Sequence, residues 1–206
     1  MRDRGHRVVC VTATRGEAAD PASGLAERAA LAEVRSRELE QALASLGVEE
    51  HHWLDLPDGG CAEVDPEIPV SALTSLLDEV RPDTVITFGP DGFTGHPDHI
   101  AVSGWTDLAV AGCTGAPDLL HAVTTERARV DSSLDEDFDV FYLGQPRICA
   151  EHELAVHLEL SGAMLERKVE ALLHQPSQTS ALVDAVGLDR FRAWVATESF
   201  AARPTS

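Results

Sequence analysis

A strand, a glycine-rich loop and a helix, over residues 84–111, constrain the fold of this chain more than any other stretch. Residues 84–88 are all β-branched or aromatic, as in a buried strand, and residues 89–95 hold three glycines. Pro97 suits the first position of a helix, where its missing N–H costs nothing. Ligands of open α/β sheets bind beyond the carboxyl ends of strands, so a binding site is expected at this loop.

Two histidines and a carboxylate, His96, Asp98 and His99, lie at the start of that helix. The peptide dipoles at a helix start disfavour positive charge, so a histidine there tends to stay neutral. Neutral imidazole is the form that binds a metal. The alternative is a polar capping loop whose histidines merely face water. Because the pattern has both a mechanism and the right flanking elements, it favours a functional site.

The composition is typical of a soluble globular protein. Its 206 residues are enough for one domain with a single core, so we expect one domain over residues 1–206. A net charge of −19 argues against a nucleic-acid partner, because phosphate binding needs a basic face. The four cysteines form no Cys-x-x-Cys pair, which favours reduced thiols in a cytoplasmic protein. No apolar run in the sequence reaches membrane-spanning length, and no dinucleotide-binding or P-loop glycine motif is present.

Strand and helix patterns alternate along the chain, which predicts an α/β fold with a mostly parallel sheet and helices on both faces. Gly47 is expected just past the end of the first long helix. The expected strands are residues 6–13, 51–56, 84–88, 119–124, 138–143 and 154–160. The expected helices are residues 23–46, 69–80, 97–111, 161–174 and 191–195.

Residues 95–99, Gly-His-Pro-Asp-His, and the Arg-Pro-Asp of residues 81–83 resemble the second signature of the PIG-L/LmbE family of zinc-dependent N-deacetylases. The resemblance extends from His6 to about residue 178. It implies a Rossmann-like, three-layer α/β domain, a zinc ion or another divalent metal, and removal of an acyl group from N-acetylglucosamine-type or thiol-conjugate substrates. In its catalytic centre His99 would bind the metal and His96 would donate to the oxyanion. Asp98 would orient or charge the ring of His96.

Other polar residues also follow expected strand ends, and parallel strands end on one rim of a sheet. Glu17 follows the first strand and Asp58 the second. The resemblance implies that Arg35 and Asp58, with Glu17, bind sugar or polyol hydroxyls of the substrate. For Arg35 the alternative is a simple ion pair with Glu38, which lies three residues along the same helix face.

The first signature of the family, Ala-His-Pro-Asp-Asp-Glu after its first strand, is missing from this sequence. The resemblance implies that this motif supplies two zinc ligands and the general base. A hydrolytic zinc site needs three protein ligands and an open position, and only His99 carries over. We therefore expect a chain that is incomplete at its N-terminus and lacks the first strand of the sheet.

The alternative is a genuine short form that is catalytically inactive and acts in sugar binding or assembly. A missing interior strand leaves two unpaired sheet edges, so such a form is expected to be unstable or to form homo-oligomers.

Overall fold

The computed structural model describes residues 5–18, 23–131, 141 and 143–203. Contacts between residues divide the chain into two compact units. Unit 1 comprises residues 1–58 and 160–196, and unit 2 comprises residues 59–159 and 197–206. Strands and helices occur in both units, so the α/β fold class is confirmed. The expectation of one domain stays a prediction. Among the described residues, no helix combines the length and apolarity that crossing a bilayer requires.

In unit 1 two parallel strands are joined by a long helix. The strands pair in register from Val9 opposite Glu50 to Thr12 opposite Trp53. A parallel pair needs such a crossover connection, because its two strands run in the same direction. The elements of unit 1 are β1 (Val9–Thr12), α1 (Leu25–Ser45), β2 (Glu50–Trp53), α6 (Gly162–Leu173), α7 (Pro176–Val186) and α8 (Leu188–Trp194).

The ends of α1 follow simple capping rules. Gly47 lies just past the helix with φ +69°, as predicted, because a left-handed residue there favours glycine. At the other end the cap is Gly24, one residue after the predicted start of the helix at residue 23. The carboxylate of Glu27 accepts the backbone N–H of Gly24 at 2.9 Å and so replaces a side-chain cap.

A cluster of apolar side chains joins α6, α7 and α8. Val169, Phe191 and Val195 are its buried centre, and residues of all three helices pack around them. Lys168 on α6 also donates from Nζ to the carbonyl of Val195 at 2.7 Å. These contacts hold the helices together as one packed group.

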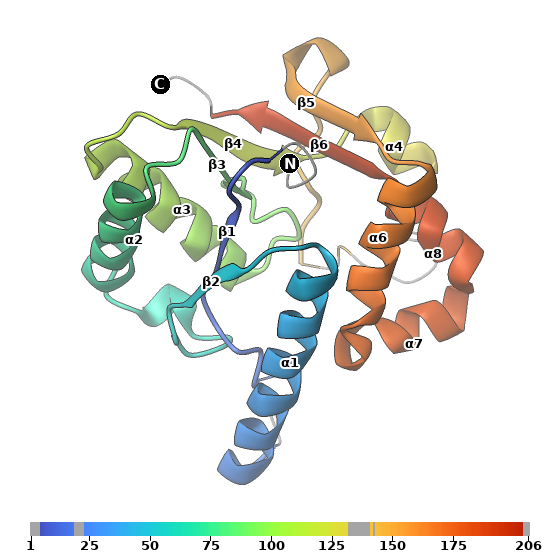
Figure 1. The fold of residues 1–206 in the computed structure, drawn as a ribbon, viewed down its shortest axis with the longest axis horizontal. Helices are drawn as coiled ribbons and strands as arrows, with labels where there is room; N and C mark the ends of the chain where they lie inside the picture. The colour runs from blue at the N-terminus through green and yellow to red at the C-terminus, as the bar shows by residue number, and fades with distance from the viewer. Residues whose placement is uncertain (1–4, 19–22, 132–140, 142, 204–206) are drawn as a thin grey trace. The chain divides into compact units, whose positions relative to one another are not determined.

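Unit 2 is built around a four-stranded sheet in the order β3-β4-β6-β5. The β3–β4 pair is parallel, whereas β6 runs antiparallel to both β4 and β5. The helices α2 and α3 pack side by side, and α3 contacts β3 (Figure 1). The elements of unit 2 are η2 (Cys61–Glu63), α2 (Glu67–Val80), β3 (Thr84–Phe88), α3 (Pro97–Gly112), β4 (Asp118–Val123), α4 (Glu126–Asp131), η3 (Glu151–Glu153), β5 (Leu154–Glu159) and β6 (Thr197–Ala202).

In each of the two sheets, one edge strand has a sequence that is typical of strands in the interior of a sheet. β3 pairs with β4 alone and β1 pairs with β2 alone among the described residues. Their sequences are apolar or β-branched throughout, a composition typical of strands covered and paired on both sides. Even so, Ile86 in β3 is 44% exposed and Val11 in β1 is 36% exposed. Each of these two strands therefore has one unpaired edge within its own unit.

The structure departs from the expected elements at the C-terminal end. The sequence pattern predicted no strand after residue 195, but residues 197–202 form β6, which lies between β4 and β5. Alternating burial in β6, with Ser199 and Ala201 inward, explains the pairing. The predicted strand at residues 138–143 lies, apart from Phe141 and Leu143, outside the described residues.

Candidate active site

The loop between β3 and α3 folds into tight, left-handed turns. Gly92 and Gly95 have φ +66° and +73°, and Phe93 has φ +61°, a value that non-glycine residues seldom adopt. The N–H of Gly95 donates to the carbonyl of Asp91 at 3.1 Å and closes one turn. Positive φ at Phe93 marks backbone that its surroundings hold in place. The loop delivers the chain to His96, which is the N-cap of α3.

His99 is held in one orientation by its neighbours. Its Nδ1 lies 3.0 Å from the carbonyl oxygen of Gly92 and 3.2 Å from Oγ1 of Thr94. A carbonyl accepts only, so the hydrogen bond to Gly92 assigns the ring proton to Nδ1. The ring stacks on Phe88 with centroids 4.1 Å apart and an interplanar angle of 3°. Burial lowers the pKa of His99, although the hydrogen bond to Gly92 opposes that shift. His99 therefore presents an unprotonated Nε2.

His96 carries the opposite tautomer. Its Nδ1 accepts the backbone N–H of Asp98 at 3.2 Å, the usual geometry of a side-chain N-cap. Because Nδ1 accepts, the proton of the neutral ring lies on Nε2. The rings of His96 and His99 have centroids 5.0 Å apart and are tilted by 36°. Two neighbouring imidazoles thus present a lone pair on one Nε2 and a proton on the other.

Asp98 is occupied by backbone groups. Its side chain accepts the N–H of Gly59 on Oδ2 at 2.7 Å and the N–H of Cys61 on Oδ1 at 3.0 Å. The residue is only 6% exposed, and its position in the first turn of α3 also favours negative charge. Its described contact with His96 is made through its own backbone N–H. A catalytic role for Asp98 stays a prediction, and its contacts are those of an anchor between η2 and α3.

In unit 1, the carboxylates of Glu17 and Asp58 both accept hydrogen bonds near the end of β1. The carboxylate of Asp58 accepts from Oγ1 of Thr14 at 3.0 Å and from the N–H of Ala18 at 2.8 Å. The N–H of Asp58 in turn donates to Oε1 of Glu17 at 3.0 Å. Both carboxylates therefore close the turn that follows β1.

Arg35 reaches the same turn from α1. Its Nη1 donates to the carbonyl of Gly16 at 2.6 Å, and its Nε is buried without a hydrogen-bond partner. A Cβ at Gly16 would lie 2.7 Å from Nη1 of Arg35, so glycine is needed for this approach. Glu38 is bound instead by Ser177, whose N–H donates at 3.0 Å and whose hydroxyl also donates. The described contacts therefore do not include the ion pair of Arg35 with Glu38.

The structure groups the predicted residues in two sets. His96, Asp98 and His99 lie together in unit 2, and Glu17, Arg35 and Asp58 lie around the turn after β1 in unit 1. That both sets face one substrate stays a prediction. Sequence reasoning missed Phe88, Gly92 and Thr94 as partners of His99. All three lie within eleven residues of it, so the spacing of the loop could have suggested them.

The described residues do not fit a complete zinc site. Among them no group of three or more histidine, cysteine, aspartate or glutamate side chains lies close enough to hold a metal. A catalytic zinc needs three protein ligands. His99 has the features of one such ligand, an unprotonated Nε2 and an N–H fixed by a backbone carbonyl.

The fold defines an α/β protein whose polar loop follows the carboxyl end of a parallel strand, the usual place for a ligand site. Comparison of the sequence identifies the family. The family described as GlcNAc-PI de-N-acetylase (PIG-L) matches residues 1–110, more than half of the chain. This chain therefore belongs to the PIG-L family.

A curated relative is named 1D-myo-inositol 2-acetamido-2-deoxy-alpha-D-glucopyranoside deacetylase, from Kineococcus radiotolerans. It is 33% identical over 141 residues, which cover 55% of this chain and 39% of that protein. The chain thus spans well under two thirds of the length of this relative.

Two solved structures share the fold. The N,N'-diacetylchitobiose deacetylase of Pyrococcus horikoshii has a TM-score of 0.59 and 19% identity, covering 98% of this chain and 75% of its own. The 4-carboxy-2-hydroxymuconate hydratase GalB of Pseudomonas putida has a TM-score of 0.65 and 15% identity, covering 100% of this chain and 88% of its own. The two likenesses show the LmbE-like fold alone, since one of these enzymes is a deacetylase and the other a hydratase.

Proposed function

We propose that this chain is part of an amide hydrolase that removes an acetyl or acyl group from the nitrogen of an N-acetylglucosamine-type substrate. The pair of imidazoles at residues 96 and 99 carries the proposal, because one ring has a lone pair on Nε2, the other has a proton on Nε2, and the ring centroids are 5.0 Å apart. Membership of the PIG-L family and the name of the relative, a deacetylase of an acetamido sugar, support the substrate class.

His96 would act on the oxygen of the amide. Attack on an acetamide carbonyl places negative charge on that oxygen, and a fixed N–H donor stabilises it most in the transition state. The Nε2–H of His96 is such a donor, because the helix start holds its Nδ1. In unit 1, Arg35 would bind a sugar or polyol hydroxyl of the substrate, because its guanidinium carries N–H donors beyond the one that holds the Gly16 carbonyl. Asp58 and Glu17 would shape the turn that presents it.

We further propose that His99 is a ligand that this chain contributes to a zinc ion or another divalent cation. The remaining ligands would come from residues other than those that the structure describes. Two observations support this view: the described residues lack a three-ligand group, and β3, which leads to the histidine loop, has an unpaired edge with an exposed Ile86. Parallel strands end on one rim, so a strand added beside β3 would bring its following residues toward His99. Metal analysis of the longest gene product of the locus tests this: His99→Ala should lose the metal, and an equal metal content in the two proteins would overturn the proposal.

The catalytic proposal is tested by acetate release from N-acetylglucosaminyl compounds, measured on the longest gene product that the locus encodes. Replacement His96→Ala should lower kcat about 10²–10³-fold, the usual loss for one oxyanion donor, and leave the metal content unchanged. The matched control is His52→Ala, which removes an exposed histidine of β2 and should change neither quantity. Loss of metal in His96→Ala would instead exchange the roles of the two histidines.

The lack of a three-ligand group among the residues that the structure describes also favours a second candidate function. In that case the chain binds an N-acetylated sugar, or takes part in assembly, without catalysis. Sugar binding by calorimetry, without acetate release and without stoichiometric metal in the longest gene product, would support this function and exclude the first.

A further inference from the structure

A short segment that follows β4, residues 143–147, lies directly on the histidine loop, and we name it the strap. A Cβ at Gly95 would lie 2.4 Å from the carbonyl oxygen of Leu143, and a Cβ at Gly144 would lie 3.1 Å from Cα of Gly95. Backbone therefore touches backbone at this point: a Cβ at Gly95 would clash with the strap, and a Cβ at Gly144 would have to move the loop by a few tenths of an ångström. Just before the strap, Phe141 makes an edge-to-face contact with Phe93, with centroids 6.0 Å apart.

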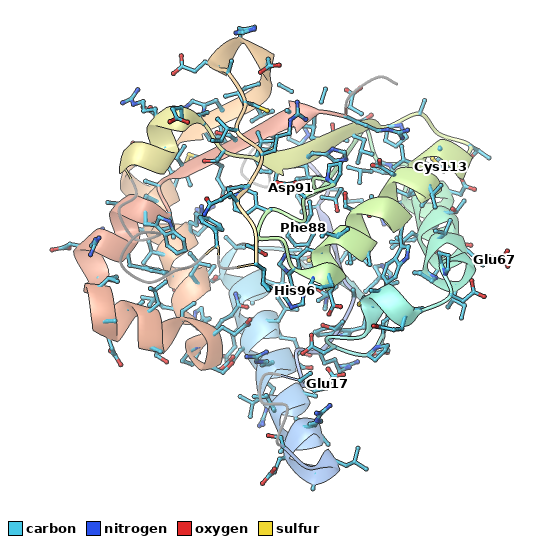
Figure 2. The ribbon with its side chains drawn as sticks, turned by 180° about the vertical axis from the view of Figure 1, so that it is seen from behind. Glu17, Glu67, Phe88, Asp91, His96 and Cys113 are labelled. Carbon is cyan, nitrogen blue, oxygen red and sulfur yellow. The ribbon has the colours of Figure 1, made fainter. Side chains whose placement is uncertain are left out.

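Asp91 ties the strap to the loop. Its Oδ2 accepts the backbone N–H of Arg147 at 2.6 Å. The carbonyl of Arg147 accepts from the N–H of Thr124, and the carbonyl of Thr124 accepts from Cys149, each at 2.9 Å. The strap is thus fixed to the end of β4 on one side and to Asp91 on the other. Figure 2 shows Asp91 beside Phe88, on the loop that leads to His96.

The other carboxylate oxygen of Asp91, Oδ1, destabilises the folded state. This oxygen is buried without a hydrogen-bond partner, and a buried unpaired acceptor destabilises the folded state. A Cβ at Gly89 would lie 2.5 Å from this oxygen, so the loop makes room for the carboxylate with a glycine. Costs of this kind are expected at functional sites and call for an explanation.

The turn that Asp91 begins also directs a carbonyl at His99. The carbonyl of Asp91 accepts from Gly95 at 3.1 Å, which closes the turn around Gly92 and Phe93. The carbonyl of Gly92 then accepts the Nδ1–H of His99 at 3.0 Å. A shift of this turn would turn the Gly92 carbonyl away and free the ring of His99 to exchange its tautomer.

We propose that Asp91 is a positioning residue for His99. By holding the strap against the loop, it fixes the direction of the Gly92 carbonyl and so keeps the proton of His99 on Nδ1 and the lone pair on Nε2. The importance of that lone pair rests on the proposed function, but the link from Asp91 to the ring does not.

The test measures the tautomer of His99 in the 206-residue chain by ¹⁵N NMR of its imidazole nitrogens at pH 8, with His99→Gln identifying the signals. In the unchanged chain the proton is expected on Nδ1. Asp91→Ala should give a mixture of tautomers and at least about tenfold faster amide exchange in residues 92–99 and 143–147, because locally opened turns exchange faster. Asp91→Asn should behave like the unchanged chain, since its amide oxygen still accepts from Arg147. The matched control is Asp118→Asn, an exposed aspartate at the start of β4, which should change nothing.

A second variant opens the strap from the other side. Gly144→Val leaves Asp91 in place but cannot approach Gly95, so it should give the same mixture of tautomers and the same faster exchange. The Gly144→Val result also decides the matter if Asp91→Ala does not fold. An unchanged His99 tautomer in the folded variants would overturn the proposal, as would a loss in Asp91→Asn equal to that in Asp91→Ala. Acetate release is not measured, so failure of the proposed hydrolase would leave this result intact.

Discussion

The loops after β1 and β3 both collect polar side chains at a strand end, but they leave those side chains in different states. After β1, both oxygens of Asp58 are taken by Thr14 and Ala18, and Glu17 accepts from Asp58. After β3, the hydrogen bonds of the two imidazoles within the described part of the chain use only Nδ1. The first loop is closed by its own polar groups, and in the second the two Nε2 atoms take no part in those hydrogen bonds. A position at a strand end therefore indicates a candidate site. The polar atoms that the loop itself does not use in hydrogen bonds indicate which chemistry the site can perform.

The largest effect that tests this comparison is expected for Asp98. It lies in the helix that follows the histidine loop, but its carboxylate, like that of Asp58, accepts hydrogen bonds from groups of the protein itself. Asp98→Ala would leave the N–H of Gly59 and the buried N–H of Cys61 without their acceptor. The free energy of unfolding should fall by about 2–4 kcal/mol, measured by urea denaturation. Asp98→Asn, which keeps one acceptor, should lose less. Unchanged stability with strongly reduced deacetylase turnover would instead move Asp98 to the catalytic group.

Asp58 gives the corresponding test in unit 1, with a smaller expected effect. Asp58→Ala removes the acceptor of Thr14 and of the Ala18 N–H in a half-buried setting. A loss of about 1–2 kcal/mol in unfolding free energy is expected, since this is the usual cost of such hydrogen bonds. Thr14→Val is the control that removes only the side-chain bond, and it should account for part of the loss. If Asp58→Ala leaves stability unchanged and abolishes sugar binding, the turn is as open as the histidine loop.

The smallest effect is expected at Asp78, a surface carboxylate in α2. The backbone N–H of Thr114, and then its hydroxyl, lower the pKa of Asp78 from the ordinary value of 3.8. A lowered folded-state pKa means that the charged form stabilises the fold above pH 3.8, and that this contribution is lost as pH falls through the folded pKa. The Tm of Asp78→Asn should therefore lie slightly below that of the unchanged chain at pH 7. The gap should close in acid, and a gap that persists after the carboxylate of the folded protein is protonated would exclude the carboxylate as its source.

Local features of this fold could be read from the sequence, whereas features made by distant residues could not. Pro97 at the start of α3 and Gly47 after α1 obey rules that involve one turn of chain. The tie between Asp91 and Arg147 joins residues 56 positions apart, and no pattern near either residue announces it. The same limit applies to β6, whose place between β4 and β5 is set by its partners.

The candidate site shows the same division. His96, Asp98 and His99 stood out because they are neighbours in the sequence, and the structure places them together. The sequence pattern could not say which imidazole nitrogen keeps a proton, since that depends on the acceptors around each ring. Nor could it show that Glu38 binds Ser177, 139 positions away, in place of Arg35.

The backbone contact between Gly95 and Gly144 limits the substitutions that related sequences can accept at these two positions. A side chain at either position would push the other backbone away, so neither can change by itself without moving the histidine loop. In related chains, a residue larger than glycine at one of the two places should coincide with an altered length or course of the segment bearing the other. Such paired changes would identify the related proteins in which the histidine loop has a different structure and serves a different reaction.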